Sequence, residues 1–168
     1  MKIALVLGSV SDMPVAEKAF ETLAAFKIEY ETHILSAHRS PDAVADFSRN
    51  ARERGFGVII AIAGMAAHLA GVIASYTTLP VIGVPCKGGA LDGLDALLST
   101  AQMPSGVPVA TVALNGGVNA ALLAAQILSL GDGRLADELL AYKKRLADEI
   151  TRKDAELNRV IRKFEVSE

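Results

Sequence analysis

The chain alternates short apolar runs with turn and helix-like segments, and this alternation limits what it can fold into. Apolar runs of strand length occur near residues 2–7, 28–35, 58–63, 80–85 and 107–114. A repeated order of strand, loop and helix is typical of α/β proteins with a parallel sheet. The first, third and fourth runs are almost continuously apolar, as expected for strands that helices cover on both faces. The pattern predicts a three-layer α/β/α fold with a parallel sheet of about five strands.

The length and the charge of the chain bound its organisation and its partners. A chain of 168 residues fits a single domain with a substantial core. We divide this domain into an α/β core, residues 1–131, and a C-terminal helical extension, residues 132–168. The formal net charge of -2 provides no broad basic field, so we do not expect nucleic acid as a partner. A single cysteine, Cys86, excludes an intramolecular disulfide framework, and no cysteine and histidine cluster predicts a metal site.

Two apolar stretches bear on where the protein resides. Residues 56–74 carry no formal charge apart from a possible one on His68, but a strand ending at Gly64 and a new helix explain them better than a membrane span does. The apolar run at residues 2–7 is too short for a signal peptide. We therefore expect a cytoplasmic protein that does not associate with membranes.

The segment 116–130 predicts a helix that is apolar on nearly all sides and must therefore be buried. The domain itself can cover part of this helix, and subunit association would cover the rest, which predicts a homo-oligomer. A charged helix is expected after residues 131–133, and its apolar residues are spaced mostly by four or seven positions. That spacing leaves two interpretations open, a helix that covers its own domain and an arm that packs on a neighbouring subunit. The apolar stripe consists of Leu135, Leu139, Leu146, Ile150, Leu157 and Phe164.

Three turns at strand ends combine small and polar residues. In a parallel sheet with right-handed crossovers, the loops at the carboxyl ends of the strands lie along one edge, where open α/β folds bind ligands. We therefore expect the three turns to converge. They are Gly8-Ser9-Val10-Ser11-Asp12, Ser36-Ala37-His38-Arg39-Ser40-Pro41 and Ala63-Gly64-Met65-Ala66-Ala67-His68.

The first turn suits a ribose and a phosphate. Gly8 permits close approach of a ligand, Ser9 and Ser11 can donate hydrogen bonds, and Asp12 can accept them from hydroxyl groups. The alternative is ordinary helix capping by Ser11 or Asp12, with Pro14 in the first turn of the helix. The glycine patterns of dinucleotide-binding and Walker-type loops are both absent.

The other turns supply an acid/base group and a cation. Arg39 can hold a phosphate or carboxylate in a two-pronged contact, and His38 can exchange a proton near neutral pH. A surface arginine and a capping histidine are the structural alternative. His68 lies in an apolar segment, so a packed or helix-associated role competes with a role in catalysis. Lys87 begins a glycine-containing turn that is either a flexible ligand loop or solvated. We interpret Cys86 as a small apolar strand-end residue, because nothing places a base beside it.

Taken together, five ordered motifs resemble the N5-carboxyaminoimidazole ribonucleotide mutase family (class I PurE) of purine biosynthesis. The similarity extends over residues 3–130, where the segment 119–128 also agrees with the family. The motifs are Gly8-Ser9-Val10-Ser11-Asp12, Ser36-Ala37-His38-Arg39-Ser40-Pro41, Ala66-Ala67-His68-Leu69, Gly93-Leu94-Asp95 and Gln102-Met103-Pro104-Ser105-Gly106-Val107-Pro108.

The resemblance implies a flavodoxin-like fold, an octamer, and an isomerase that moves a carboxylate within an imidazole ribonucleotide without a cofactor or metal. Ser9 and Arg39 are then expected at the substrate phosphate and Asp12 at the ribose hydroxyls. The same resemblance implies that His38 transfers the proton and that His68 lines the carboxylate pocket. The further positions expected to bind substrate are Ser11, Ser36, Gly64 and Ala66.

Two other functions are weighed against this one. A related branch of the family carboxylates aminoimidazole ribonucleotide directly with carbon dioxide, and it typically has lysine where this chain has Arg39 and a Ser-Asn-Ala-Leu run at residues 66–69. The mutase branch is therefore favoured. A non-enzymatic, receiver-like nucleotide-binding module would need acidic residues after the first strand and a phosphorylatable aspartate after the third. Those strand ends carry Gly8-Ser9 and Gly64-Met65 instead.

Three positions depart from the usual mutase pattern. Met65 stands in place of a glycine, Ala70 in place of a proline, and Gly88-Gly89 lies in a loop where a serine is common. Met65 adds volume where the backbone would approach the substrate, and Ala70 loosens a turn. These changes concern the expected carboxylate pocket and leave the phosphate and proton-transfer residues intact.

Overall fold

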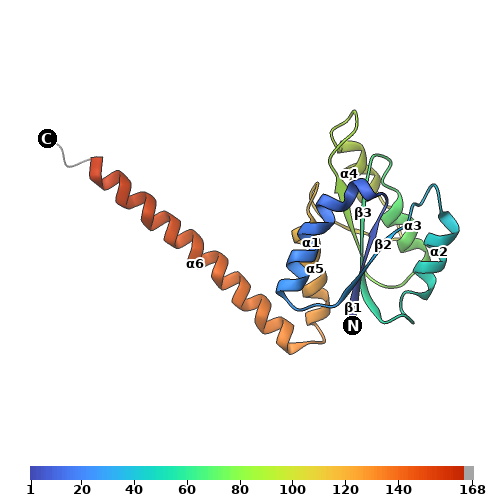
Figure 1. Cartoon of the computed structure of the whole chain (residues 1–168), viewed down its shortest axis with the longest axis horizontal. Coiled ribbons are helices and arrows are strands. Elements are labelled where there is room, and N and C mark those ends of the chain that lie inside the picture. Colours follow the sequence, from blue (N-terminus) through green and yellow to red (C-terminus); the bar gives the residue numbers. More distant parts are fainter. Residues whose placement is uncertain (165–168) are drawn as a thin grey trace.

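The computed structural model describes residues 1–164, with side chains described as far as residue 160, and contains a five-stranded, all-parallel sheet. Its strand order is β2-β1-β3-β4-β5. Figure 1 shows helices on both sides of this sheet. The predicted three-layer α/β/α fold is confirmed, and the order of the strands is that of a flavodoxin-like protein. The strands are β1 (Lys2–Leu7), β2 (Tyr30–Ile34), β3 (Phe56–Gly64), β4 (Val81–Cys86) and β5 (Ala110–Thr111).

The residues of β1 alternate between two cores, one on each face of the sheet. Ile3, Leu5 and Leu7 pack in a cluster with residues of α1 and α5, whereas Ala4 and Val6 pack in a second cluster with α2 and α3. Burial on both faces explains why this strand is continuously apolar. The helices are the short 3-10 turn η1 (Val10–Asp12), α1 (Met13–Ala25), α2 (Pro41–Asn50), α3 (Leu69–Tyr76), α4 (Leu94–Ala101), α5 (Gly117–Ser129) and α6 (Gly133–Phe164).

The last strand is much shorter than the sequence predicts. An apolar run at 107–114 indicates a full strand, but β5 contains only Ala110–Thr111 and pairs with β4 at Ile82 and Gly83. β5 is the edge strand of the sheet. Pro108 within this run has no amide hydrogen to donate to a neighbouring strand, which limits regular pairing on its N-terminal side.

Helix α5 is covered mainly by its own chain. It packs against α1, α6 and the sheet, and five of its apolar residues are fully or nearly buried. A β-carbon on Gly117 would lie 2.3 Å from the carbonyl oxygen of Val15, so this glycine permits the close approach of α5 to α1. The domain itself therefore covers most of the apolar surface of α5, for which subunit association was predicted to provide part of the cover. Whether other subunits add to this cover stays a prediction.

Helix α6 has two different parts, and only the first of them covers its own domain. Leu135 and Leu139 are buried against the domain core. Figure 1 shows the rest of the helix extending away from the domain. Leu146, Ile150 and Leu157 are accordingly exposed. The side chain of Phe164, the last residue of the predicted stripe, and the whole of residues 165–168 lie outside the described part of the chain.

Candidate active site

A cleft of about 840 Å³ lies along the carboxyl edge of the sheet. The loops that follow β1, β2, β3 and β4 form it, and Asn115 from the segment after β5 completes its lining. This is the edge at which the strand order reverses between β1 and β3, where open α/β proteins bind ligands. The predicted convergence of the three turns is confirmed. All nine site residues named from the sequence line the cleft, namely Ser9, Ser11, Asp12, Ser36, His38, Arg39, Gly64, Ala66 and His68.

The first loop is held in shape by a reciprocal pair of hydrogen bonds. The Ser9 amide donates to Oδ2 of Asp12 over 2.9 Å, and the Ser9 hydroxyl oxygen accepts from the Ser11 amide over 3.3 Å. Helix capping by Ser11 or Asp12 was the structural alternative, and it is confirmed for Asp12, whose carboxylate takes part in the capping box of η1, but not for Ser11. Ser9 caps the short turn η1, and Asp12 precedes α1 without a side-chain capping bond because its carboxylate turns back to Ser9. Pro14 does lie in the first turn of α1, as expected.

Asp12 is a buried carboxylate at the floor of the cleft, with only 7% of its surface exposed. Burial raises the pKa of Asp12 above its ordinary value, and hydrogen bonds from the Ser9 amide and the Cys86 thiol partly offset this effect. A buried carboxylate has lost water as a donor, so it gains from hydroxyl groups that a ligand brings. This position is chemically suited to a ribose.

Cys86 lies beside Asp12 at the end of β4 and is almost fully buried. Burial, and then the nearby charge of Asp12, raises the pKa of the Cys86 thiol to about 12. The thiol therefore stays protonated at neutral pH and does not act as a nucleophile. This agrees with the interpretation of Cys86 as a structural residue. No local sequence pattern indicated that Cys86 lines the cleft.

Arg39 presents a cation to the cleft without a carboxylate to balance it. Its Nη2 donates to the carbonyl oxygen of Gly8 over 3.1 Å, and its Nε donates to the hydroxyl oxygen of Ser36 over 3.3 Å. Both acceptors are neutral. Among the side chains that the structure describes, no carboxylate lies within ion-pair distance of this guanidinium. A guanidinium that is held in place but not neutralised is suited to bind an anionic group.

His38 and His68 form a direct pair across the cleft. Nε2 of His38 lies 2.9 Å from Nδ1 of His68, and the two rings meet edge to face at 79°. One nitrogen must donate and the other must accept, so the tautomers or charges of the two rings are linked. His68 precedes α3 but makes no side-chain capping bond. His68 is associated with a helix, as the N-cap residue of α3, but the interpretation of a packed side chain is wrong, because the ring is exposed and faces His38.

The loop between β4 and α4 forms the opposite wall. Gly88 and Gly89 adopt positive φ angles and line the cleft together with Lys87. The ammonium group of Lys87 pairs with Asp92 over 3.1 Å, and the Lys87 amide donates to Oδ1 of Asn115 over 2.8 Å. Of the two interpretations of this turn, the structure favours a loop that lines the ligand cleft.

Asn115 also lines the cleft, although it is not among the residues predicted from the sequence. Its side chain supports the β4 to α4 loop, and its own φ is +55°. The available signal was the run Asn115-Gly116-Gly117 at the end of a strand-like segment, the same combination of small and polar residues that marked the first three turns. Asparagine is one of the few residues that readily adopt this left-handed conformation.

Within the described part of the chain, no group of three histidine, cysteine, aspartate or glutamate side chains is placed to hold a metal ion. None of the helices in residues 1–164 is both long enough and apolar enough to cross a membrane.

Fold and cleft together define a flavodoxin-like α/β protein whose carboxyl-edge cleft contains an arginine and a histidine pair. The family model described as AIR carboxylase matches residues 2–149. The chain belongs to this family.

Curated relatives and a solved structure agree with that assignment. The chain is 51% identical to the N5-carboxyaminoimidazole ribonucleotide mutase of Mycobacterium tuberculosis, covering 97% of this chain and 94% of that protein. It is 50% identical to the mutase of Thermotoga maritima, covering 95% and 93%. The crystal structure of Treponema denticola PurE is similar at a TM-score of 0.83 and 34% identity, covering 92% of this chain and 97% of the other.

Proposed function

We propose that this protein is an N5-carboxyaminoimidazole ribonucleotide mutase of de novo purine biosynthesis. It converts N5-carboxyaminoimidazole ribonucleotide into 4-carboxy-5-aminoimidazole ribonucleotide. The observation that carries the proposal is the His38 and His68 pair, 2.9 Å apart, in the same cleft as an arginine with no carboxylate partner. Relatives that bear this name and share half of the sequence over nearly the whole chain support it.

The phosphate and ribose of the substrate are assigned to the β1 and β2 loops. Ser9 and Ser11 would bind the phosphate through their hydroxyl groups, because they precede α1 in the cleft. Arg39 would bind it through its guanidinium, which reaches the same loop at the carbonyl oxygen of Gly8. Asp12 would accept hydrogen bonds from the ribose hydroxyls. Ser36 holds Arg39 in position through its hydroxyl oxygen. These contacts would fix the imidazole ring beside the histidine pair.

The reaction then needs one group that gives and takes a proton. In the first step the bond between the exocyclic nitrogen and its carboxylate breaks, carbon dioxide leaves, and His38 gives a proton to that nitrogen. In the second step the ring carbon attacks the carbon dioxide, and His38 removes the proton from the same ring carbon. Substrate and product are isomers, so no other reactant is consumed. His68 would hold the His38 ring in the required orientation through the nitrogen contact between them.

Direct carboxylation of aminoimidazole ribonucleotide by carbon dioxide is the alternative function. Arg39 after His38 and the Ala66-Ala67-His68-Leu69 run favour the mutase. Two assays of the purified protein separate the functions. The first supplies freshly prepared N5-carboxyaminoimidazole ribonucleotide, and the second supplies aminoimidazole ribonucleotide with bicarbonate. We expect efficient product formation from the first substrate only. Preferential turnover of the second would replace the mutase by the carboxylase, and turnover of neither would favour a binding module.

We also propose that the distal part of α6 packs on a second copy of this chain. Beyond residue 142 this helix leaves Leu146, Ile150, Leu157 and Val160 exposed, at 47%, 66%, 60% and 53% of their surfaces. Apolar side chains that follow one another along a projecting helix are typical of an interaction surface. A homo-octamer is the assembly that the family resemblance implies.

Light scattering of the full chain tests the assembly. We expect an octamer for the unmodified protein and smaller species for Ile150→Glu, which places a charge on the apolar face. The control is Thr151→Glu, because the neighbouring residue lies about 100° around the helix and leaves this face unchanged. A stable monomer of the unmodified chain would contradict the assembly.

A further inference from the structure

Met65 holds an unfavourable backbone conformation at the edge of the cleft. Its φ is +55°, and three other non-glycine residues in the described part of the chain share a positive φ. Asp92 and Asn115 are types that tolerate this conformation, and Lys27 lies at the other end of the sheet. A methionine does not tolerate it readily, and glycine would adopt it at no steric cost. Strain of this kind persists only where the surrounding structure imposes it, and such residues cluster at functional sites.

The Met65 side chain extends from the β3 loop to the β4 loop. Its residue follows Gly64 at the end of β3, and its Cγ lies 3.7 Å from the position that a β-carbon on Gly89 would occupy. Gly89 belongs to the loop between β4 and α4. Met65 therefore stands against the opposite wall of the cleft that it shares with His38 and His68. With 67% of its surface exposed, the side chain is not part of the domain core.

An apolar side chain at this place meets a specific need of the reaction. Carbon dioxide is small and uncharged, so neither Arg39 nor the histidine pair can hold it by charge. It stays beside the ring carbon only if the walls of the site are closed and water is excluded. The neighbouring residues Ala63 and Ala66 are too short to reach across the cleft. Met65 is long and flexible enough to close this gap.

We propose that the Met65 side chain is the wall that retains carbon dioxide between its release from nitrogen and its capture by carbon. This inference rests on the proposed mutase function and assigns a specificity-determining role within it. Met65 takes part in no bond change. The nitrogen to carboxylate bond breaks, the carbon to carboxylate bond forms, and one proton moves through His38, as above. Met65 decides whether the carbon dioxide that is captured is the molecule that was released.

The test uses substrate labelled with ¹³C in its carboxylate, in unlabelled bicarbonate buffer. Three variants of the full chain are compared with the unmodified protein. Met65→Gly removes the wall and adopts the left-handed conformation without strain, so it is expected to fold. Met65→Leu keeps an apolar side chain of similar volume. Leu98→Ala is the control, because Leu98 on α4 is also an exposed apolar side chain, at 48%, but does not line the cleft.

We expect the unmodified protein, Met65→Leu and Leu98→Ala to retain most of the label in the product. Met65→Gly should lose label to the buffer at least about fivefold more than the unmodified protein and should release aminoimidazole ribonucleotide, because carbon dioxide escapes from an open site. The loss of label separates retention from general damage, which would slow turnover without exchanging the carboxylate. Sizing of all four proteins shows whether assembly has changed.

Retention of the label by Met65→Gly as complete as in the unmodified protein would overturn the inference. Loss of the octamer in Met65→Gly would also overturn it, since Met65 would then be an assembly contact. If the unmodified protein forms no product from the labelled substrate, the mutase function itself fails and the inference fails with it. If the unmodified protein forms product and Met65→Gly retains all of the label, only the role of Met65 is contradicted and the mutase function stands.

Discussion

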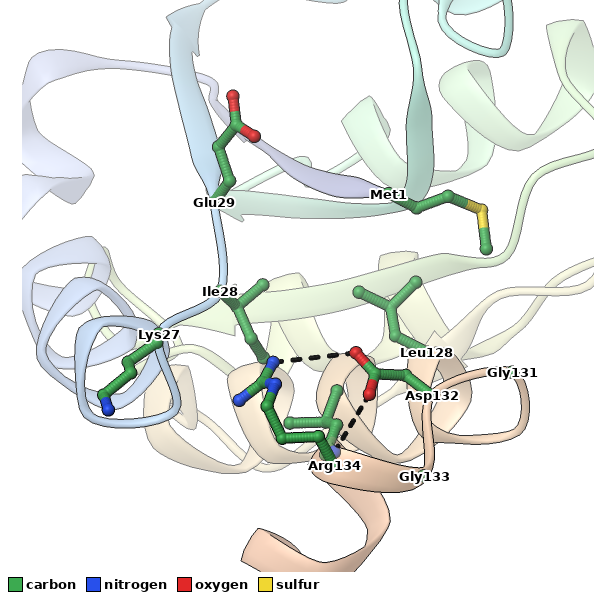
Figure 2. Close-up of a pocket in the computed structure, with 10 residues that line it drawn as sticks. Met1, Lys27, Ile28, Glu29, Leu128, Gly131, Asp132, Gly133 and Arg134 are labelled. Atoms are coloured by element: carbon green, nitrogen blue, oxygen red, sulfur yellow. Dashed lines mark hydrogen bonds and ion pairs between the residues drawn. The ribbon is translucent and has the colours of Figure 1, made fainter.

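The sheet carries a cavity at each end, and the two differ in how their charges are balanced. The cavity at the amino edge has a volume of about 500 Å³ and is lined by the start of α6 and by the segment before β2. Figure 2 shows Arg134 and Asp132 there facing each other. Arg134 also pairs with Glu138 over 2.9 Å. In the cleft at the carboxyl edge, Arg39 has only neutral acceptors.

This difference indicates which cavity binds a ligand and which is structural. The hydrogen bonds of the amino-edge cavity join parts of the chain, since Oδ1 of Asp132 accepts from the Leu135 amide at the start of α6 and Arg134 donates to the carbonyl oxygen of Phe26. Its arginine is paired with carboxylates without a ligand. In the cleft a cation, a buried carboxylate and two histidines face the same space. Cavity size alone does not separate the two, whereas the pairing of their arginines does.

The largest effect is expected on kcat, when His38 in the cleft is compared with Arg134 in the amino-edge cavity. His38→Asn should lower kcat by about 10²–10⁴, the usual contribution of a general acid and base, while product binding stays nearly unchanged. Arg134→Ala, at the amino edge, should leave kcat unchanged. Steady-state kinetics and calorimetric titration with product measure these effects. Substantial turnover by His38→Asn would remove the proton-transfer role.

The two arginines should differ next in substrate affinity. Arg39→Ala should raise KM by about 10- to 100-fold, because a charge-assisted hydrogen bond to phosphate contributes about 1.5–3 kcal/mol. Arg39→Lys should recover part of this loss, since lysine keeps the charge but not the two-pronged geometry. An unchanged KM in Arg39→Ala would contradict the phosphate assignment. Equal effects of Arg39→Ala and Arg134→Ala would contradict the distinction between the cavities.

Replacement by asparagine should change the stability of the protein differently at Asp12, in the cleft, and at Asp132, in the amino-edge cavity. Because the pKa of Asp12 is raised in the folded protein, its ionisation costs stability as pH rises from its ordinary value of 3.8 through the raised pKa. Asp12→Asn removes this cost, so the variant should be more stable than the unmodified protein at neutral pH. The advantage should vanish as pH falls towards 3.8. Its substrate affinity should nevertheless fall.

Asp132→Asn is the matched change at the amino edge. It removes an ion pair with Arg134 and should not stabilise the protein at neutral pH. Denaturant unfolding of both variants between pH 4 and pH 8 measures the difference. If Asp12→Asn is instead less stable than the unmodified protein throughout that range, ionisation of the buried Asp12 carboxylate does not lower the free energy of unfolding.

The smallest effect is expected from the exposed ion pairs of Arg134. Arg134→Ala should lower the free energy of unfolding by less than about 1 kcal/mol, since partly exposed pairs contribute little. Thermal unfolding in low and high salt measures this effect. A loss of several kcal/mol would mean that the amino-edge cavity depends on Arg134 far more than its exposure suggests.

The sequence was sufficient to predict the sheet and the place of the cleft. Strands buried on both faces are continuously apolar, and polar residues at their carboxyl ends meet at one edge, as Ser9, His38 and His68 do. The contact between His38 and His68 spans 30 positions of the sequence, so local patterns identified each residue without identifying the pair. The length of β5 was overestimated because pairing at an edge depends on tertiary structure.

Other features of the cleft and of the amino-edge cavity could not be read from local patterns. Met65 adopts a left-handed conformation that its residue type does not favour, and only the loops around it impose that conformation. The amino-edge cavity joins Met1, Ile28 and Arg134, which are far apart in the chain. Their meeting depends on the packing of α6 and the β2 segment. Neither feature has a periodic or compositional signal.

A methyl nuclear magnetic resonance titration tests most directly that the carboxyl-edge cleft is the ribonucleotide site. Met65 lines the cleft and Met1 lines the amino-edge cavity, so their methyl groups report on the two ends of the same sheet. Addition of 4-carboxy-5-aminoimidazole ribonucleotide should shift the Met65 signal and leave the Met1 signal in place. A shift of Met1 without a shift of Met65 would contradict the assignment of the site.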